Sequence, residues 1–426
     1  MKILWICSGV LSDFSEEFNV KKRYVGSWQT GLLTQLKNKT NLEFGLCFPI
    51  IDKSRRRDGT AHSHRYYSFN CNLFNIENID EIGEMTDRFR EIISDFLPDV
   101  IHIWGSELPH SYAAAQACEE LGIINKVIVD IQGLYSTLGT HFYADIPSQY
   151  RVGALKQAKD LIDAYGIYEQ RLLKKKCSVF GRTDWDKACV AMINDTLAYF
   201  HADRVLRHGF YENAGNWNID RCEPYSIFIS QGYDPFKGLH YLLQAMPTIL
   251  KSLPSAHIYV AGHDHVFTEV SDDNRATHSY GRYIKDLCEE LHLKDNITFL
   301  GSLSEKEMVA QYLKTHVVVS ASSCENSSNS VSEAMLLGVP VVSSMAGGIT
   351  SLMVNKRDGY IYQHNAPYML AYYILQIFGD RKIAKEFSES ASQSMSKIVN
   401  ITKNTSRIAE VYAIIGGSSE SSRSVI

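Results

Sequence analysis

Two glutamates, Glu325 and Glu333, lie eight positions apart in a short polar stretch between two apolar runs. The run at 316–320 is typical of a buried strand, and the run at 339–342 is typical of another. The polar residues between them therefore predict a strand-to-helix turn at the carboxyl end of a parallel strand, where open α/β sheets bind ligands. Amides at the start of that helix favour an anion, and a carboxylate on each side could hold the hydroxyls of a sugar and of a ribose.

The same spacing has a second interpretation. Ser330 and Glu333 fit a capping box, in which the serine is the N-cap and the glutamate bonds back to its amide. The two interpretations are compatible, because a capped helix still presents its first amides, here those around Ser328, Asn329 and Ser330, to a phosphate.

Apolar runs and helical patterns alternate along the chain, which predicts an α/β fold with parallel sheets. A polar loop at 213–218 precedes a fresh series of strands, so we expect domains at 1–212 and 213–400, followed by a helix at 401–415 and a disordered tail at 416–426. The strands expected in the first domain are 3–8, 42–48, 99–104, 127–131 and 178–181, and those in the second are 226–230, 257–261, 297–300, 317–320 and 339–343.

The composition fits a large cytoplasmic enzyme. The 426 residues suffice for two sizeable cores, and a net charge of −5 does not indicate nucleic-acid binding. The nine cysteines include no Cys-x-x-Cys pair, which fits a reducing compartment. No apolar run approaches the roughly 18 residues that span a bilayer, and the first residues predict a strand and not a signal peptide.

The second half resembles glycosyltransferase family 4, the retaining sugar-nucleotide transferases of the GT-B fold. The resemblance is close over residues 225–400 and holds only in outline before them. The polar residues between the two glutamates are most similar to those of bacterial members that build surface polysaccharides. The motifs that carry the resemblance stand in the family's order: Glu325-x7-Glu333, Gly338-Val339-Pro340-Val341-Val342, Ala346-Gly347-Gly348 and Asp358-Gly359.

The resemblance implies two Rossmann-like domains that face a cleft, with the helix at 401–415 crossing back onto the first. It implies transfer of a sugar from a nucleotide diphosphate sugar, such as a UDP-sugar, to a saccharide or lipid-linked saccharide acceptor, with retention and with no metal or other cofactor. Glu325 would hold the donor sugar near the reacting carbon, Glu333 would bind the ribose, and backbone groups near Leu303 would contact the base.

Further donor contacts are expected around the diphosphate. Lys237, before Gly238, matches the family's Lys-Gly and would act as a counter-ion. The family has a second phosphate-binding cation, an arginine, at the position that Gly232 occupies here. One positive group that would bind the donor is therefore missing or is supplied from elsewhere. Arg182 and His263 are further candidates for contact with the donor phosphates.

The acceptor side is expected on the first domain. Gly9 and Gly26 could bring the backbone close to a substrate, and Trp28 could stack on a sugar or pack in the core. Gln132 stands where many family members have a histidine at the reacting sugar; it can hydrogen-bond a hydroxyl but cannot act as a base. Glu107 ends another strand and could bind the acceptor.

Three patterns have competing explanations. Asp184 and Asp186 spell the metal-binding Asp-x-Asp of the GT-A fold, but they also follow Thr183 as helix-start residues, which we favour. His263 and His265 could be metal ligands, although no further ligand cluster closes such a site. The basic runs 55–57 and 174–176 are explained as solvated positions, with peripheral contact at the inner face of a membrane as the alternative.

Two other functions stay open. One is a GT-B sugar-nucleotide epimerase, and the other is a catalytically silent GT-B binding subunit. A nicotinamide dehydrogenase is disfavoured, because no Gly-x-Gly-x-x-Gly follows the first strand.

Overall fold

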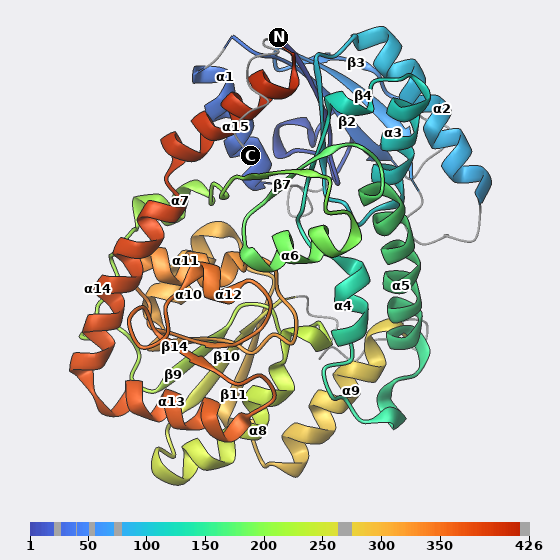
Figure 1. Cartoon of the computed structure of the whole chain (residues 1–426). Coiled ribbons are helices and arrows are strands. Elements are labelled where there is room, and N and C mark those ends of the chain that lie inside the picture. Colours follow the sequence, from blue (N-terminus) through green and yellow to red (C-terminus); the bar gives the residue numbers. More distant parts are fainter. Residues whose placement is uncertain (21–26, 40, 51–55, 72–78, 263–274, 418–426) are drawn as a thin grey trace. The chain divides into compact units, whose positions relative to one another are not determined.

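The computed structural model describes residues 1–20, 27–39, 41–50, 56–71, 79–262 and 275–417. The chain forms two compact units (Figure 1). Unit 1 contains residues 1–137, 161–205 and 399–426, and unit 2 contains residues 138–160 and 206–398. The segment 138–160, although it lies early in the sequence, therefore packs with the second unit.

Unit 1 is built on an eight-stranded sheet in the order β3-β4-β2-β1-β5-β6-β7-β8. All neighbours pair in parallel except β3 and β4, which are antiparallel. The expected strands are present with small shifts at their ends, whereas β3, β4 and β8 were not predicted. The strands are β1 Lys2–Ile6, β2 Glu43–Ile50, β3 Gly59–Ala61, β4 His64–Asn70, β5 Val100–Trp104, β6 Val127–Asp130, β7 Ser178–Gly181 and β8 Ala198–His201.

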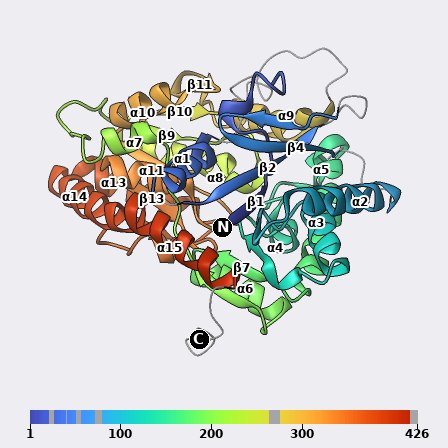
Figure 2. The same cartoon turned by 90° about the horizontal axis from the view of Figure 1, so that it is seen from above.

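Helices cover this sheet. On α2, Met85, Phe89 and Ile92 recur at helical spacing and are buried, which gives the helix an apolar stripe that faces the core. Figure 2 shows α2 beside α3, where buried alanines allow close approach. The helices with residues in unit 1 are α1 Ser27–Lys39, α2 Ile79–Phe96, α3 Pro109–Glu120, α4 Tyr135–His141, α5 Gly153–Leu173, α6 Asp184–Ile193 and α15 Ile401–Ile415; α4 and α5 continue into unit 2.

The last helix, α15, belongs to unit 1 and packs beside α1 (Figures 1 and 2). The buried Tyr412 hydroxyl accepts a hydrogen bond from Trp5 Nε1 at 3.0 Å and lies 2.6 Å from His102 Nδ1. Burial holds the pKa of His102 well below its usual value, so its ring is neutral. These bonds fasten the end of the chain to strands β1 and β5.

Unit 2 is a six-stranded parallel sheet in the order β11-β10-β9-β12-β13-β14. Its strands are β9 Ser226–Ile229, β10 His257–Ala261, β11 Ile297–Gly301, β12 Val317–Ser320, β13 Val341–Ser344 and β14 Tyr360–Tyr362, of which β14 was not predicted. Its helices are α7 His208–Glu212, α8 Leu239–Ser252, α9 Arg275–Glu290, α10 Glu305–Lys314, α11 Asn329–Leu337, α12 Ile349–Leu352, α13 Pro367–Gly379 and α14 Arg381–Ile398.

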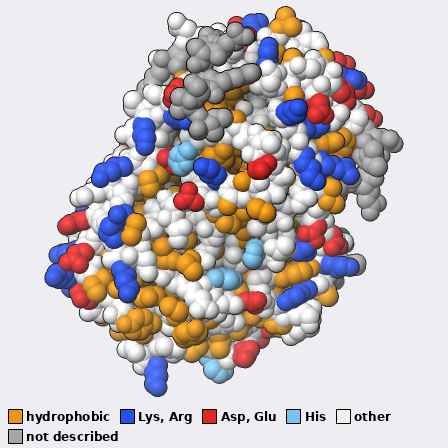
Figure 3. Space-filling view, viewed as in Figure 1, with side chains coloured by type: hydrophobic (Ala, Val, Ile, Leu, Met, Phe, Trp, Pro, Cys, Tyr) orange, Lys and Arg blue, Asp and Glu red, His pale blue; other side chains and the backbone are white. Residues whose placement is uncertain are grey.

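On the face of unit 2 drawn in Figure 3, hydrophobic side chains gather over the region of α13. Two tyrosines of this helix, Tyr368 and Tyr372, are 68% and 57% exposed. None of the helices among the described residues is long and apolar enough to cross a membrane.

Candidate active site

The strand order of unit 2 identifies a ligand-binding position. From β9 the chain moves outward to β10 and β11 on one side and then returns to β12 on the other side of β9. The order reverses between β9 and β12, and open α/β sheets bind ligands at such a switch point, beyond the carboxyl ends of the strands. The loop after β9 carries Lys237, and the turn after β12 carries Glu325.

Lys237 and Glu325 meet at this point. Lys237 Nζ lies 2.7 Å from Glu325 Oε2, and the two side chains are 17% and 19% exposed. The Ser322 hydroxyl donates to the same carboxylate oxygen at 3.3 Å. Two charged groups predicted from separate motifs are therefore held together, half-buried and within reach of solvent.

Backbone contacts fix both loops. Gly238, at φ +77°, begins α8 so close to Ala321 that any side chain there would overlap the Ala321 carbonyl oxygen. The Ser323 amide donates to the Phe236 carbonyl at 2.7 Å. These contacts join the residues on either side of Lys237 to the start of the Glu325 turn, so the two loops that carry the charges are held side by side.

The Glu325 turn is held from its other side by a second glycine. Gly347 adopts φ +53°, and a Cβ there would overlap the Glu325 carbonyl oxygen, while the Gly348 amide donates to that oxygen at 3.0 Å. The Ala-Gly-Gly motif thus has a physical reason, since only glycine tolerates both the backbone angle and the close approach.

Helix α11 begins earlier than the capping-box interpretation requires. Its N-cap is Ser328, whose side chain accepts from the Val331 amide at 3.4 Å and lies 3.0 Å from the Ser330 hydroxyl. Glu333 is consequently the fifth helical residue and not the third, so the predicted capping box and its first-turn position are wrong. The start of the helix at Asn329 follows the turn that carries Glu325.

Glu333 has a partner that sequence reasoning missed. Arg207 Nη2 lies 2.7 Å and Nε 3.2 Å from Glu333 Oε1, and the carboxylate is 7% exposed. Burial raises the pKa of Glu333, and the Arg207 charge opposes that rise. The two residues are 126 positions apart, and no local motif marks Arg207.

Gly232 occupies the position where the family has its second cation, and packing leaves no room there for a side chain. A Cβ on Gly232 would overlap the side chain of Val260, and the Gly232 amide donates to the Ala261 carbonyl at 3.1 Å. Leu303 lies between β11 and Ser304, the N-cap of α10. His263 and His265 lie outside the described residues.

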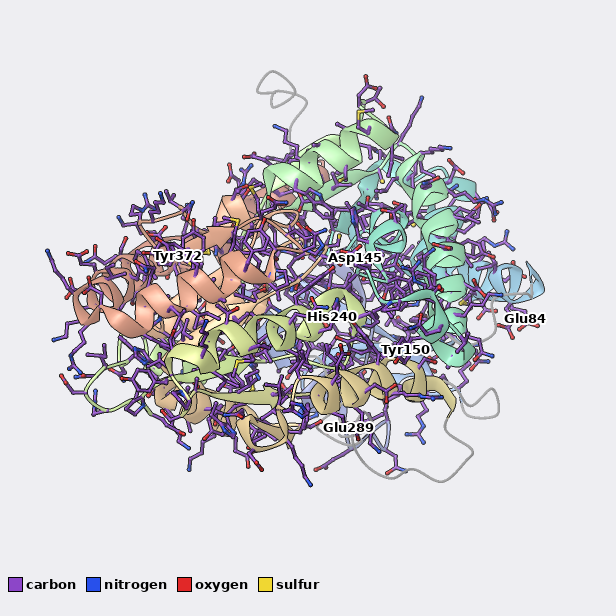
Figure 4. The ribbon with its side chains drawn as sticks, turned by 90° about the horizontal axis from the view of Figure 1, so that it is seen from below. Glu84, Asp145, Tyr150, His240, Glu289 and Tyr372 are labelled. Atoms are coloured by element: carbon purple, nitrogen blue, oxygen red, sulfur yellow. The ribbon has the colours of Figure 1, made fainter. Side chains whose placement is uncertain are left out.

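The segment 138–160 contacts the Lys237 region, which no sequence pattern predicted. Tyr241 on α8 donates to Asp145 at 2.8 Å, and His240 Nε2 lies 2.7 Å from the Ala144 carbonyl oxygen. The Ser323 hydroxyl donates to the His141 carbonyl at 2.9 Å. Figure 4 shows Asp145, His240 and Tyr150 grouped where this segment meets unit 2 helices.

Unit 1 has a switch point of its own, between β1 and β5. Gly9 follows β1, and a Cβ there would meet nothing within 4 Å. Glu107 follows β5, and Gln132 follows the neighbouring β6. The Glu107 Oε2 and Gln132 Nε2 atoms are shielded from solvent and have no hydrogen-bond partner among the described residues.

Arg182 is occupied inside unit 1. Its side chain is 2% exposed, forms an ion pair with Asp130 and donates to the Ile131 carbonyl. This arrangement does not favour the predicted contact with a donor phosphate. The interpretation of the neighbouring acids as helix-start residues is confirmed: Thr183 caps α6 and forms a capping box with Asp186.

The remaining predicted positions are only partly described. Gly26 lies outside the described residues, as does the side chain of Trp28, which is at the start of α1. In the basic run 174–176, Lys175 is not solvated as expected: its side chain is 9% exposed, pairs with Glu119 and donates to Gln116 at 2.8 Å.

Comparison with known proteins places this geometry in a family context. Residues 212–394 match the family described as Glycosyl transferases group 1. An uncharacterized glycosyltransferase of Methanocaldococcus jannaschii is 28% identical over 179 residues, which are 41% of this chain and 42% of that protein. The chain thus spans less than half the length of this curated relative.

Solved structures match over nearly the whole chain. Sucrose-phosphate synthase from Thermosynechococcus elongatus superposes with a TM-score of 0.71 at 15% identity, covering 98% of this chain and 100% of the other. HepE of Anabaena, solved in complex with UDP-glucose, gives a TM-score of 0.66 at 15% identity over 97% and 100% of the two chains. The chain therefore has the GT-B fold, and its residues 212–394 match the Glycosyl transferases group 1 family.

Proposed function

We propose that the protein transfers a sugar from a nucleotide diphosphate sugar to a hydroxyl acceptor with retention of configuration, in the assembly of a surface polysaccharide. The observation that carries this proposal is the 2.7 Å pair of Lys237 and Glu325 at the switch point of unit 2, directly before the start of α11. The matches to glycosyltransferases and the UDP-glucose bound by HepE support a UDP-sugar as the donor.

In the proposed complex the leaving diphosphate lies against Lys237 and the first amides of α11. The lysine supplies a full positive charge. Asn329 and Ser330 are the first residues of α11, so their amides lie at the positive end of the helix, which faces the ligand. Charge that develops on the departing phosphate is stabilised by groups already in place, which is the main catalytic effect that fixed dipoles and charges provide.

Lys237 and Ser322 both donate to Glu325 Oε2 and so hold its carboxylate beside the proposed diphosphate position. The sugar is attached to that diphosphate, so Glu325 binds hydroxyls of the donor sugar. Glu333, fixed by Arg207, binds the ribose. The acceptor is a saccharide or a lipid-linked saccharide and lies on unit 1, where Gly9 and Glu107 follow the two strands of the second switch point and Gln132 follows the neighbouring β6. The leaving phosphate serves as the base, and Lys237 with the first amides of α11 stabilises the diphosphate, so the reaction requires no metal.

A donor screen tests the proposal. UDP-glucose and the same sugar on other nucleotides are compared by thermal shift, since a ligand that binds the folded state raises the melting temperature. Incubation with donor and bacterial extract should then release nucleotide and give a product of retained configuration by NMR, and Glu325→Ala should lower turnover more than donor affinity. Epimerised donor without transfer would indicate the epimerase, and absence of both reactions would indicate a silent subunit.

A further inference from the structure

A strained turn lies in the segment 138–160, which packs with unit 2. Ala144 and Asp145 are consecutive residues, and both have positive φ, +46° and +61°. A side chain makes this region of backbone angles unfavourable, and alanine tolerates it less readily than aspartate. Such a turn persists only where surrounding contacts hold it, so its contacts show which part of unit 2 it serves.

Two neighbouring residues in the first turn of α8 hold this strained turn. The Tyr241 hydroxyl donates to the Asp145 carboxylate at 2.8 Å, and His240 Nε2 lies 2.7 Å from the Ala144 carbonyl oxygen. Burial lowers the pKa of His240 to about 4, so its ring is neutral, and Nε2 carries the proton because a carbonyl oxygen can only accept. Asn365, which follows β14, also donates to Asp145, at 3.3 Å.

The same segment reaches the chain on the other side of Lys237. The Ser323 hydroxyl lies 2.9 Å from the His141 carbonyl oxygen and 3.4 Å from the Phe236 carbonyl oxygen. The ring centroids of Phe142 and Phe236 are 6.1 Å apart. Phe236 directly precedes Lys237, and α8 begins two residues after the lysine. The segment is therefore linked to unit 2 both before and after Lys237.

We propose that Asp145 is a positioning residue of the donor site: through Tyr241 it fixes the first turn of α8 and so sets where the Lys237 ammonium group meets the donor diphosphate. This inference rests on the function proposed above. Lys237 ends a 3-10 turn of three residues, Pro235–Lys237, and Gly238 follows as the N-cap of α8. A turn this short has few hydrogen bonds of its own, so its orientation follows that of the helix it precedes.

The rest of α8 does not depend on this contact. Leu242, Leu243 and Met246 are buried in unit 2, and burial of their apolar surface keeps the helix folded. Loss of the bond between Tyr241 and Asp145 would let the strained turn relax and would release only the start of the helix. The expected effect is weaker binding of a diphosphate with little loss of global stability.

Asp145 acts in its ionised form. The hydrogen bond from Tyr241 holds the pKa of Asp145 below its ordinary value, so the carboxylate is charged at neutral pH and is a stronger acceptor than a neutral group. Asp145→Asn keeps a neutral acceptor and a residue that tolerates positive φ, whereas Asp145→Ala keeps neither. Because Asp145 is exposed, neither substitution should prevent folding.

Nucleotide binding tests the inference on the full-length protein. UDP, ADP and GDP are titrated by isothermal calorimetry, and the tightest is used with the variants. Tyr241→Phe and Asp145→Ala should each lower its affinity about tenfold, as expected for loss of a hydrogen bond to a charged group, while Asp145→Asn should stay within about threefold of the parent. The matched control, Tyr259→Phe, removes a 2.7 Å bond to Glu223 before the amino end of β9 and should bind like the parent.

The decisive measurement repeats Tyr241→Phe in the Lys237→Ala background. If Tyr241 and Asp145 act through the lysine, the second substitution should lower affinity by less than about twofold there, because no ammonium group remains to be positioned. A contact that serves only folding would cause the same loss in both backgrounds.

Unchanged affinity in Tyr241→Phe and Asp145→Ala, or an equal loss in the two backgrounds, would overturn the positioning role. Nucleotide binding by the parent would then leave the proposed function standing. If the parent binds none of the three nucleotides, the proposed function fails and the inference fails with it.

Discussion

At the scale of single residues, the candidate site depends on charges that are paired before any ligand arrives. Lys237 holds Glu325, and Arg207 holds Glu333. A paired carboxylate is pre-oriented, so the protein avoids the entropy of ordering it when the donor binds.

Lys237→Ala should lower kcat/KM about a hundredfold or more, since removal of one charged donor at a leaving group has effects of this size. Lys237→Arg should lose far less, because it keeps the charge. The dependence on Lys237 should be strong, because Gly232 supplies no second cation and Val260 occupies the space a side chain there would need. Steady-state kinetics with a UDP-sugar measures the effect, and Lys251→Ala, an exposed lysine on α8, is the matched control. A loss below about threefold would assign the phosphate charge to another residue.

Arg207→Ala should destabilise unit 2 by about 2–3 kcal/mol at pH 8, because it leaves the Glu333 carboxylate buried without its counter-charge. The loss should be smaller at pH 5. Without Arg207 the folded-state pKa of Glu333 rises further above its ordinary value, so the protonated carboxyl is tolerated at low pH and the penalty grows as pH rises.

A double-mutant cycle with Glu333→Ala, read by chemical denaturation, measures the coupling. We expect the double variant to recover part of the loss, with a coupling of about 1 kcal/mol or more. Effects that add within about 0.5 kcal/mol would show that the pair contributes no interaction energy.

At the scale of helices, strands and turns, the site depends on close backbone contacts at two glycines with positive φ, Gly238 and Gly347. At each glycine, the carbonyl oxygen of a neighbouring loop occupies the space that a side chain would need. The loop after β9 and the turn after β12 are thus packed backbone against backbone, and small movements in either must displace the other.

Gly347→Ala should lower the melting temperature sharply or unfold the Glu325 turn, since the new Cβ would overlap the Glu325 carbonyl oxygen in a left-handed conformation. Gly83→Ala, in the middle of α2 with open space around its Cβ position, is the control and should stabilise the protein by about 0.5–1 kcal/mol. Differential scanning calorimetry compares the two. Equal effects of the two substitutions would contradict the packing argument.

Transfer activity should persist in excess EDTA. Asp186 is engaged in capping α6, and no group of three or more His, Cys, Asp or Glu side chains that could hold a metal occurs in the described parts of the chain. We expect the rate to stay within about twofold, because Lys237 and the first amides of α11 take the place of a metal at the diphosphate. Loss of activity that manganese or magnesium restores would revive the metal interpretation of Asp184 and Asp186.

The sequence predicted elements well where one local signal dominates. Continuous apolar runs located β10 and β12 to the residue. Strand β4, His64–Asn70, was missed because it is rich in polar and aromatic residues and lacks such a run. Glu325 and Lys237 could be predicted from their motifs, but Arg207 could not, because its role comes only from a partner 126 positions away.

At the scale of the whole molecule, the chain passes repeatedly between its units. Unit 1 takes three stretches of the sequence and unit 2 takes two. The segment 138–160, which local patterns assigned to the first domain, packs with unit 2 through Asp145 and Ala144, both with positive φ. Such contacts arise from the tertiary fold and leave no periodic signal in the sequence.

Tyr412→Phe should destabilise unit 1 by about 2 kcal/mol or more, because it leaves the buried Trp5 N–H without its acceptor and removes the partner of His102 Nδ1. Urea denaturation followed by tryptophan fluorescence, to which Trp5 contributes as one of five tryptophans, measures the change. Tyr372→Phe, on the exposed face of α13, should alter stability by less than about 0.5 kcal/mol. Similar effects of both changes would mean that α15 is not fastened through this hydroxyl.

The bond between Trp5 and Tyr412 also sets an order of events during synthesis. The two residues are 407 positions apart, so at about 5–20 residues per second the ribosome makes the acceptor roughly 20–80 seconds after the donor. Unit 2 ends at residue 398 and α15 begins at Ile401, so strands β1 and β5 lack α15 until every residue of unit 2 has been made. The nascent first unit therefore stays incompletely covered until α15 has been made, and exposed apolar surface of this kind is what chaperones protect.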